Sequence, residues 1–472
     1  MSEDTVHANQ MFEIDTGLAR RVQEELGQNV YLCYQCLKCT SGCPLSEFFD
    51  YQPHQVMRSL QYGLADIALE SKTTWLCAAC QTCSTRCPQN LDITAIMEFL
   101  TREALDRGIK PQIPEADIFT RAFMNEVRLW GRSYELGLMV EIKLRTGNLF
   151  EDLDLGMKML QKGKFPLLPH PSRPPKKVTP VQPAGDAVAY YPGCSLHATS
   201  PEYHVSAESV CDALGIELIE PDGWICCGSS AAHRRDPEAA LRYPMENLRV
   251  IEQMGLEEVV MPCAACFNRH KAAQFEVRHH SDKQVQVEDW IGYRYKDDVV
   301  VSSLSQMILQ HSGTDRIKAA AARPLKGLKV ACYYGCLLTR PPEITEVDHP
   351  ENPTDLDELI KALGAEVVDW SYKTACCGAS HSLVRPDIAR NLSKKILTAA
   401  RQAGADVVAV ACPLCHTNLD ARQFQMEIEK PLPVLFFTQL MGLAFDLPEK
   451  EIALKKNLVD PYPLLDELGF LD

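Results

Sequence analysis

The sequence lacks several features that would point to common classes of protein. No apolar run approaches the roughly 18 residues of a membrane helix; the longest candidate, residues 434–445, is too short and contains polar side chains. The first ten residues are polar and acidic and lack the basic and apolar parts of a signal peptide. No GxGxxG follows a strand-like run and no P-loop is present. We therefore expect a cytoplasmic protein with no membrane span and no flavin on this chain.

An excess of positive charge is also missing. The formal net charge is −15, which makes nucleic acid and anionic membrane surfaces unfavourable partners. Hydrophobic residues make up 46% and charged residues 24%, as in a globular protein that buries a core. At about 150 residues per domain, the 472 residues correspond to roughly three domains.

Cysteine, in contrast, is abundant, with 20 in the chain. Disulfides are disfavoured in the cytoplasm, so metal binding or redox chemistry explains this number better. All but two of the cysteines belong to motifs. The two exceptions, Cys211 in a helical stretch and Cys332 in a strand-like run, are expected to be core thiols.

The first motif is CxxCxxCxxxCP, which occurs twice. Its first three cysteines wrap three corners of a [4Fe–4S] cubane, and the fourth ligates the other cluster. The predicted ligand sets are Cys33, Cys36, Cys39 and Cys87 for one cluster and Cys77, Cys80, Cys83 and Cys43 for the other. Structural zinc is the alternative, but zinc ligand pairs usually flank a longer loop and lack the proline. Two such clusters suit an electron relay.

The second motif is a set of five cysteines, also in two copies: a lone cysteine, a Cys-Cys-Gly and a later CxxC. The sets are Cys194, Cys226, Cys227, Cys263 and Cys266, then Cys336, Cys376, Cys377, Cys412 and Cys415. Five thiols exceed the four that zinc or a cubane needs, and vicinal cysteines can ligate adjacent irons. This predicts an iron–sulfur cluster of unusual shape. Zinc with a spectator thiol, or a redox disulfide between Cys376 and Cys377, is the alternative.

These five-cysteine sets lie in an internal repeat. The matched segments are 187–194 with 329–336, 213–219 with 362–368, and 255–263 with 404–412. In both copies an apolar, β-branched run ends at a cysteine of the set, after a helix closed by glycine. Each copy therefore predicts an α/β domain with a mainly parallel sheet and ligands at the carboxyl ends of strands. Paired repeats suggest a pseudo-twofold axis, with the two metal sites facing each other.

The predicted fold class is multidomain, α followed by α/β. The predicted segments are a helical ferredoxin-like domain at 1–162, a linker with seven prolines at 163–185, and two CCG domains at 186–324 and 325–472. Within the helical part, Asp92 predicts the N-cap of a helix over 93–107, with Gly108 at its end. Further helices are expected over 114–130 and 134–164.

Together the motifs resemble heterodisulfide reductase, with its twin-cubane C subunit fused ahead of its CCG-containing B subunit. The part from 29–36 to 92–94 resembles the former, and the segments that resemble the latter are 191–196, 333–341, 376–380, 412–416 and 433–440. The resemblance implies a noncubane [4Fe–4S] cluster in each five-cysteine set. It implies cleavage of the coenzyme M–coenzyme B disulfide, or an analogue, between the two clusters. It also implies electrons from the flavin-containing subunit of heterodisulfide reductase, with a hydrogenase or formate dehydrogenase upstream.

Three residues other than cysteine are candidates for catalysis. His381 and His416 follow cysteines of the second set closely and suit proton delivery or hydrogen bonding to cluster sulfur, with a structural histidine as the alternative. Arg340 suits binding of an anionic substrate group, with a surface ion pair as the alternative. The weaker candidates are His197, Lys373 and Arg385.

Two other functions remain open. An electron-transfer protein similar to the iron–sulfur subunit of glycolate oxidase or anaerobic glycerol-3-phosphate dehydrogenase would share both motifs. The cysteine sets of those proteins are often incomplete, whereas all ten cysteines are present here. A scaffold with zinc in the CCG sites is the second possibility. Metal content separates them, at about sixteen irons per chain for the disulfide reductase and about eight plus zinc for the scaffold.

Overall fold

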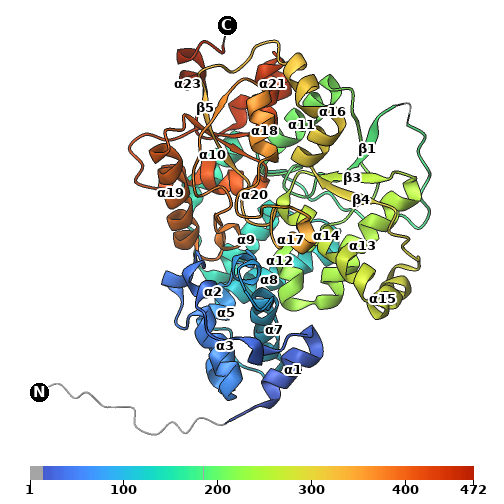
Figure 1. Ribbon diagram of the computed structural model, residues 1–472, viewed down its shortest axis with the longest axis vertical. Helices are drawn as coiled ribbons and strands as arrows, with labels where there is room; N and C mark the ends of the chain where they lie inside the picture. The colour runs from blue at the N-terminus through green and yellow to red at the C-terminus, as the bar shows by residue number, and fades with distance from the viewer. Residues whose placement is uncertain (1–13, 184, 472) are drawn as a thin grey trace, which may run out of the picture. The chain divides into compact units, whose positions relative to one another are not determined.

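A computed structural model describes residues 14–183 and 185–471 of the chain. The chain folds into two compact units, Met1–Asp117 and Ile118–Asp472 (Figure 1). The predicted fold class is confirmed, because helices are followed by two α/β repeats. The units divide the chain at a different place from the predicted segments, since helices that we expected in a domain ending at residue 162 belong to the second unit. The four predicted segments themselves stay predictions.

The first unit is built from short helices around the two CxxCxxCxxxCP motifs. Helix α7 (Ile93–Asp106) begins as predicted, because Asp92 Oδ1 accepts a hydrogen bond from the Ala95 N–H at 3.0 Å. Gly108 follows its end with a φ of 74°, in the left-handed region that favours glycine. The other helices are α1 (Gly17–Leu26), η1 (Val30–Leu32), α2 (Lys38–Ser41), η2 (Ser46–Phe48), α3 (Pro53–Tyr62), α4 (Ala65–Leu69), α5 (Lys72–Leu76) and α6 (Thr82–Thr85). Apolar side chains of α1, α3 and α7 form the core.

Three helices lie between this motif region and the first strand. They are α8 (Pro114–Trp130), α9 (Glu135–Thr146) and α10 (Leu153–Gln161). Helix α8 agrees with the prediction, whereas the predicted helix over 134–164 is two helices, because Gly147 adopts a φ of 73° and ends α9. Leu138 and Ile142 on α9 share a hydrophobic cluster with apolar residues around the first Cys-Cys-Gly, which explains why α9 belongs to the second unit.

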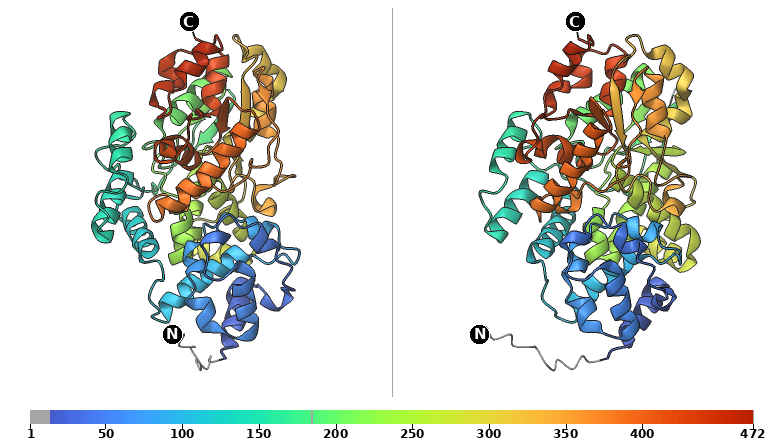
Figure 2. Two further views of the ribbon diagram at one scale, coloured as in Figure 1. Left: turned by 90° about the vertical axis from the view of Figure 1, so that its left-hand side faces the viewer. Right: turned by 60° about the vertical axis from the view of Figure 1, so that its left-hand side comes forward.

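The outward face of α9 and α10 is apolar and exposed. The side chains are about one turn apart on each helix: Val140 (49% exposed) and Leu144 (66%) on α9, and Leu153 (55%), Met157 (50%) and Leu160 (42%) on α10. In Figure 2 these two helices, in teal, lie at the edge of the second unit. Single exposed apolar side chains are common, but a group of this size is typical of a surface that binds another molecule.

Each repeat contains a four-stranded parallel sheet, as predicted. The strand orders are β2-β1-β3-β4 and β6-β5-β7-β8, so the two sheets have the same topology. The strands are β1 (Ala187–Tyr190), β2 (Glu217–Ile219), β3 (Glu258–Met261), β4 (Val300–Ser303), β5 (Lys329–Tyr333), β6 (Glu366–Val367), β7 (Val407–Val410) and β8 (Val434–Phe436). Their buried valines and alanines suit strands that are covered on both faces.

One hydrophobic core runs through both repeats. Helix α11 (Pro201–Ala213) of the first repeat packs on α21 (Phe437–Ala444) of the second, where Tyr203 stacks on Phe436 with ring centroids 4.0 Å apart. The remaining helices are α12 (Ser229–Arg235), α13 (Pro237–Met254), α14 (Ala264–His279), α15 (Ser281–Ile291), α16 (Leu304–Ala320), α17 (Pro342–Thr345), α18 (Asp355–Ala362), η3 (Ala379–His381), α19 (Pro386–Gln402), α20 (Pro413–His416), η4 (Thr417–Ala421), η5 (Arg422–Gln425), α22 (Glu449–Ile452), η6 (Leu454–Lys456) and α23 (Tyr462–Glu467). The shared core fixes the two cysteine sets relative to each other.

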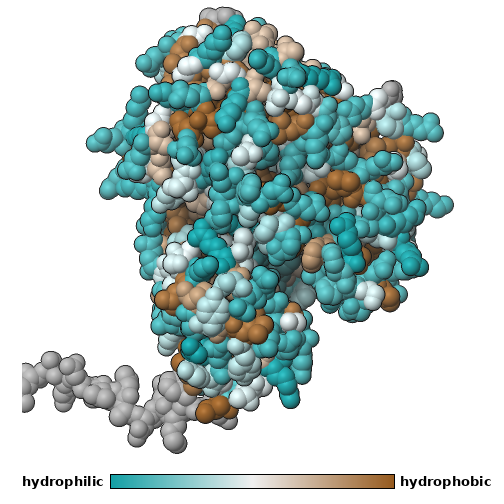
Figure 3. All heavy atoms as spheres, in the orientation of Figure 1, coloured by the Kyte–Doolittle hydropathy of each residue, from teal (hydrophilic) through white to brown (hydrophobic). Residues whose placement is uncertain are grey.

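The face of the molecule in Figure 3 is mostly hydrophilic, with small apolar areas between polar side chains. Within the described residues, no helix is both long enough and apolar enough to cross a bilayer.

Candidate iron–sulfur sites

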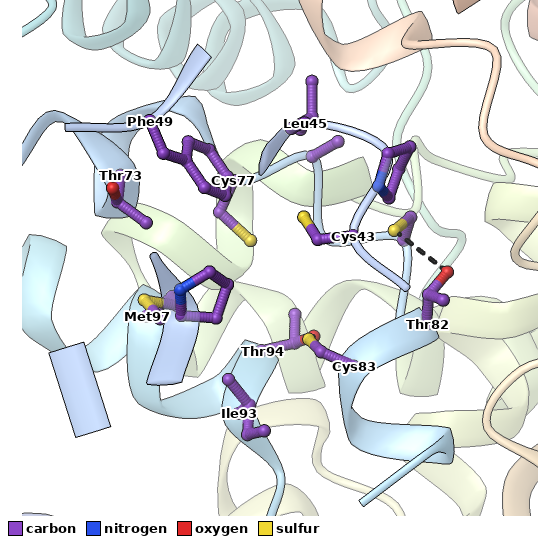
Figure 4. A pocket seen from close by; sticks show the side chains of 14 residues that line it. Cys43, Leu45, Phe49, Thr73, Cys77, Thr82, Cys83, Ile93, Thr94 and Met97 are labelled. Atoms are coloured by element: carbon purple, nitrogen blue, oxygen red, sulfur yellow. Dashed lines mark hydrogen bonds between the residues drawn. The ribbon is translucent and has the colours of Figure 1, made fainter. Parts of the chain in front are cut away.

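Four thiols of the first unit line one cavity (Figure 4). They belong to Cys77, Cys80 and Cys83 of the second CxxCxxCxxxCP motif and to Cys43 of the first. Apolar side chains, among them Met97, and the threonines Thr73, Thr82 and Thr94 line the rest of the cavity. Burial and the neighbouring thiolates raise the pKa of the Cys83 thiol well above its usual range. Four thiols that converge on an apolar cavity fit a cubane, and they are the four predicted from the spacing; their ligation stays a prediction.

Both motifs turn sharply at the same two positions. Gln35 and Leu37 in the first motif and Ala79 and Gln81 in the second have φ values of 62°, 67°, 52° and 61°. Residues other than glycine rarely adopt this conformation, and it is often found where a loop is shaped for a function. The repeated geometry indicates that both loops present their thiols in the same way.

The other four cysteines of these motifs are also neighbours. Burial and the thiolates of Cys33 and Cys36 raise the pKa of Cys39 to about 11. Desolvation and the thiolates of Cys36 and Cys87 raise the pKa of Tyr34. Cys87 of the second motif therefore lies beside the first motif, and its ligation together with Cys33, Cys36 and Cys39 stays a prediction.

The two five-cysteine sets are held in equivalent ways. Cys194 and Cys336 follow β1 and β5, and the first cysteine of each CxxC is the N-cap residue of a helix, α14 or α20. In the first set Cys227 Sγ lies 3.5 Å from Cys266 Sγ, and the equivalent pair in the second set is also 3.5 Å apart. In each set the sulfur atoms converge on one region just beyond the carboxyl ends of the strands.

Glycine and tyrosine residues repeat this equivalence in detail. A Cβ on Gly193 would lie 3.1 Å from Cys266 Sγ, and one on Gly335 would lie 3.0 Å from Cys415 Sγ. The hydroxyls of the tyrosines two residues before these glycines donate to the carbonyls of Ile225 and Ala375, at 2.7 and 2.6 Å. Both sites therefore need glycine beside a thiol, and neither has space there for a larger residue.

The two sets meet at the junction of the repeats. Hydrogen bonds from the Cys263 and Cys415 thiols hold the pKa of Cys412 well below its usual range. Cys263 belongs to the first set and Cys412 to the second, and they are only 5% and 4% exposed. Tyr203 lies at the same junction, where its hydroxyl donates to the Ala411 carbonyl at 3.3 Å and where burial beside the sulfur atoms of Cys412 and Cys263 raises its pKa well above the usual range. Two candidate clusters thus share a buried boundary.

The three predicted catalytic residues are all buried. Arg340 is 2% exposed, and its guanidinium donates to Glu351 Oε2 at 2.9 Å and to the Thr374 carbonyl at 2.8 Å. This arrangement favours a structural role for Arg340 over the predicted contact with an anionic substrate. The alternative that we predicted was a surface ion pair, but the arginine of the pair is buried. His381 is 1% exposed, and its backbone N–H bonds to the Gly378 carbonyl at 2.9 Å.

His416 is also 1% exposed. Its Nε2 lies 3.0 Å from the Val434 carbonyl and its ring stacks on Phe436 at 4.2 Å. Burial and the nearby Lys164 ammonium lower the pKa of His416 well below its usual range. The ring is therefore neutral, and proton delivery by His416 or His381 stays a prediction.

The weaker candidates are all paired with carboxylates. The pairs are His197 with Glu220 at 3.3 Å, Lys373 with Asp357 at 2.9 Å and Arg385 with Asp387 at 2.6 Å. The two thiols predicted to be core residues, Cys211 and Cys332, are 0% exposed.

Sequence reasoning missed the contacts that residues outside the motifs make with the sets. The Ser133 N–H points at Cys194 Sγ at 3.4 Å, and the Asn418 amide donates to the Cys377 carbonyl at 3.1 Å. Tyr203 reaches the junction from a helix that carries no motif. No spacing or composition signal marks these residues, because each comes from a different element and meets the thiols only through the fold.

Two domain models match the chain: a "Cysteine-rich domain" model, CCG, at residues 188–269 and 330–420, and a "4Fe-4S dicluster domain" model at residues 32–92. In the described residues, no group of three or more His, Cys, Asp or Glu side chains is arranged to hold a single metal ion.

Three curated relatives match the chain over different lengths. The 8-methylmenaquinol:fumarate reductase membrane anchor subunit of Wolinella succinogenes is 34% identical over 277 residues, which is 58% of this chain and 96% of the relative. The B subunit of the ferredoxin/F(420)H(2)-dependent CoB-CoM heterodisulfide reductase of Methanosarcina acetivorans is 26% identical over 60% of this chain and 96% of its own length. An iron-sulfur C subunit of the CoB--CoM heterodisulfide reductase of Methanocaldococcus jannaschii is 33% identical over 22% of this chain and 56% of its own length. The chain therefore belongs to the heterodisulfide reductase family of iron–sulfur proteins, with a part like the C subunit of that enzyme preceding a part like its B subunit.

Proposed function

We propose that this chain cleaves a disulfide between its two five-cysteine sets, with electrons that enter through the first unit. The observation that carries the proposal is the meeting of Cys263 and Cys412 at the junction of the repeats. A disulfide has two sulfur atoms, and two metal sites that share a boundary are placed to take one each. The substrate is the coenzyme M–coenzyme B disulfide or an analogue.

The proposed cofactors are two cubane and two noncubane [4Fe–4S] clusters. The proposed ligands are the eight cysteines of the CxxCxxCxxxCP motifs and the ten of the five-cysteine sets. When bound, the clusters supply single electrons and soft iron sites for sulfur. The reaction consumes two electrons and two protons for each disulfide and gives two thiols.

The protein contributes burial and positioning around this chemistry. Eight of the ten thiols in the two sets lie between 2% and 7% exposed, so bulk water has little access to them. Tyr203 fixes the junction through its bond to the Ala411 carbonyl and its stacking on Phe436. These contacts keep the two sets at a constant separation.

The proposal is tested by anaerobic turnover of the loaded chain. Reduced benzyl viologen supplies electrons, and the thiols released from an added disulfide are titrated with a chromogenic reagent. We expect two thiols for every two viologen radicals oxidised, and loss of this activity in Tyr203→Ala, which opens the junction, with iron content retained. Viologen oxidation without thiol release contradicts the proposal.

A second candidate function is favoured by one of the comparisons. The Wolinella relative is named as part of an 8-methylmenaquinol:fumarate reductase, and it is 34% identical over 277 residues of this chain. In this alternative the chain relays electrons from a quinol to a partner reductase and releases no thiol. Reduction of the protein by a menaquinol analogue in the absence of any disulfide would favour this alternative.

We propose that the chain works in the cytoplasm within a complex of several proteins. Its proposed partners are a protein like the flavin-containing subunit of heterodisulfide reductase and, upstream of it, a hydrogenase or formate dehydrogenase. Disulfides are disfavoured in the cytoplasm, so a chain with 20 cysteines, most of them proposed as metal ligands, suits that compartment. The exposed apolar face of α9 and α10 supports a contact with the flavin protein, because an area of this kind is stabilised by a partner surface.

A further inference from the structure

A pocket beside the first five-cysteine set lies outside the contacts assigned so far. It opens next to Cys194, the most exposed thiol of this set. Trp130, Trp224 and Tyr134 form aromatic walls, and Arg132 contributes a guanidinium. The pocket therefore combines apolar walls, one cation and access to the edge of a candidate cluster.

Part of the pocket lining, Pro166, Leu168, Pro169 and His170, comes from the segment that we expected to be a linker. Ser172 donates from its backbone N–H to the Trp130 carbonyl at 2.7 Å and from its hydroxyl to the Trp224 carbonyl at 2.7 Å. A Cβ on Gly131 would lie 1.9 Å from Ser172 O, and one on Gly223 would lie 2.4 Å from the Arg173 carbonyl oxygen. This proline-rich segment is consequently packed as a strap over the first set, and it closes one side of the pocket.

Arg132 is held in place by Trp224. Its guanidinium carbon lies 3.5 Å from the centroid of the Trp224 ring, and its Nε donates to the Trp224 carbonyl at 3.2 Å. Stacking and this one bond leave the two Nη groups at the outer edge of the guanidinium. Across the described residues, neither Nη group of Arg132 has a hydrogen-bond partner. The nearby Glu220 is occupied by His197 and by the Trp224 indole N–H.

The second repeat has an arginine at the equivalent place, and it differs in one respect. Arg340 donates to the carbonyl of Thr374, two residues before Cys376, as Arg132 donates to the carbonyl two residues before Cys226. Arg340 also binds Glu351, whereas among the described residues no carboxylate closes the Nη edge of Arg132. The first site therefore has a guanidinium edge open to a ligand, and the second does not.

We propose that Arg132 binds an anionic group of the small thiol or disulfide that reaches the first five-cysteine set. The group is a planar or tetrahedral oxyanion such as a carboxylate, sulfonate or phosphate, because the two Nη groups offer paired donors to two oxygens. The aromatic walls take the aliphatic part of the ligand, and its sulfur lies toward Cys194. This inference rests on the proposed function for the statement that the ligand carries sulfur.

The test is isothermal titration calorimetry on the anaerobic, iron-loaded chain. Two probes are compared: 3,3′-dithiodipropionate, which has two carboxylates, and bis(2-hydroxyethyl) disulfide, which is neutral. We expect Arg132→Gln to weaken binding of the dianionic probe about 10- to 100-fold, the effect of losing a charged hydrogen-bonded pair. Binding of the neutral probe should stay within about twofold of the wild type, and Arg132→Lys should fall between the two, because it keeps charge and loses the paired donors.

The matched control is Arg128→Gln, one turn earlier on the chain. Arg128 pairs with Asp236 at 2.9 Å and does not line the pocket. A second measurement needs no variant: in the wild-type chain, propionate should compete with dithiodipropionate and propionamide should not. Equal binding of the dianionic probe by wild type and Arg132→Gln, or equal loss of both probes, overturns the inference. If the wild-type chain shows this binding pattern but releases no thiols from a disulfide, the result counts against the proposed function instead.

Discussion

Replacing Gly131 by alanine should destabilise the second unit and the first five-cysteine set together. Gly131 has a φ of 76°, and a Cβ there would lie 1.9 Å from Ser172 O. Its carbonyl accepts the Cys226 N–H at 2.8 Å, and the neighbouring Trp130 carbonyl accepts the Ser172 N–H at 2.7 Å. Because the clash is with backbone, rotating a side chain cannot relieve it, and the strap or the cysteine loop must move.

The magnitude follows from these contacts. The positive φ costs an alanine about 1 kcal/mol, and the two displaced hydrogen bonds cost about 1–2 kcal/mol each where a buried N–H is left unpaired. The total is about 3–5 kcal/mol. The second unit runs from Ile118 to Asp472, and with an unfolding entropy of about 2.1 cal/mol/K per residue the expected fall in Tm is about 4–7 °C.

Gly147→Ala is the control for the backbone conformation alone. Gly147 has a φ of 73°, and a Cβ added there would meet nothing within 4 Å, so the same reasoning gives about 1 kcal/mol and a fall in Tm of about 1–2 °C. Both variants are compared by anaerobic scanning calorimetry and by iron per chain. Equal falls in Tm for the two variants, or full iron content in Gly131→Ala with an unchanged Tm, would refute the view that the strap supports the first set.

Three further predictions concern the second set, a buried carboxyl group and the apolar face. Cys412→Ala should lower iron content by about four per chain, whereas Cys332→Ala, a core thiol of the same repeat that is 0% exposed, should leave it unchanged; equal losses would argue against the ligand assignment. Burial raises the pKa of Glu126 to about 7 from 4.5, so its protonated form is favoured by folding and its contribution to stability falls as pH rises from about 4.5 to 7. Glu126→Gln should reduce the loss of stability over this range by about 1–2 kcal/mol, after allowance for partial solvent screening, and a variant with the wild-type slope in calorimetry would contradict this. Leu144→Glu with Met157→Glu, both in exposed positions, should lower the flavin that co-purifies with the tagged chain from its own cells at least about tenfold, while Val285→Glu, exposed elsewhere, should not.

The sequence was most informative where chemistry requires fixed spacing. The CxxCxxCxxxCP motifs predicted that Cys43 lies with the cysteines of the second motif, and these four thiols line one cavity. The repeat predicted two parallel sheets, because apolar runs ended at equivalent cysteines, and the two strand orders are the same. The N-cap at Asp92 was readable for the same reason, since its carboxylate needs an N–H three residues later.

Sequence reasoning was weakest where long-range packing decides the role of a residue. Arg340 follows a cysteine closely, and the sequence does not reveal its partners; folding brings Glu351 and Thr374 to its guanidinium. The segment 163–185 has the composition of a linker, yet Ser172 within it packs against Gly131. In both cases the partner lies too far along the chain, or is too ordinary a residue, to leave a pattern.

The close equivalence of the two repeats makes the difference between their arginines informative. Each five-cysteine set has the same glycine, the same tyrosine bond and the same thiol pair, so duplication explains their common framework. Each also has an arginine bound to the carbonyl two residues before the Cys-Cys-Gly, but Arg340 comes from within its repeat and is closed by Glu351. Arg132 comes from the helical segment ahead of the repeats and keeps its outer edge open. If the proposed disulfide cleavage takes place between the two sets, one open and one closed guanidinium favour a substrate whose two halves differ, or one whose two sulfur atoms are released in a fixed order.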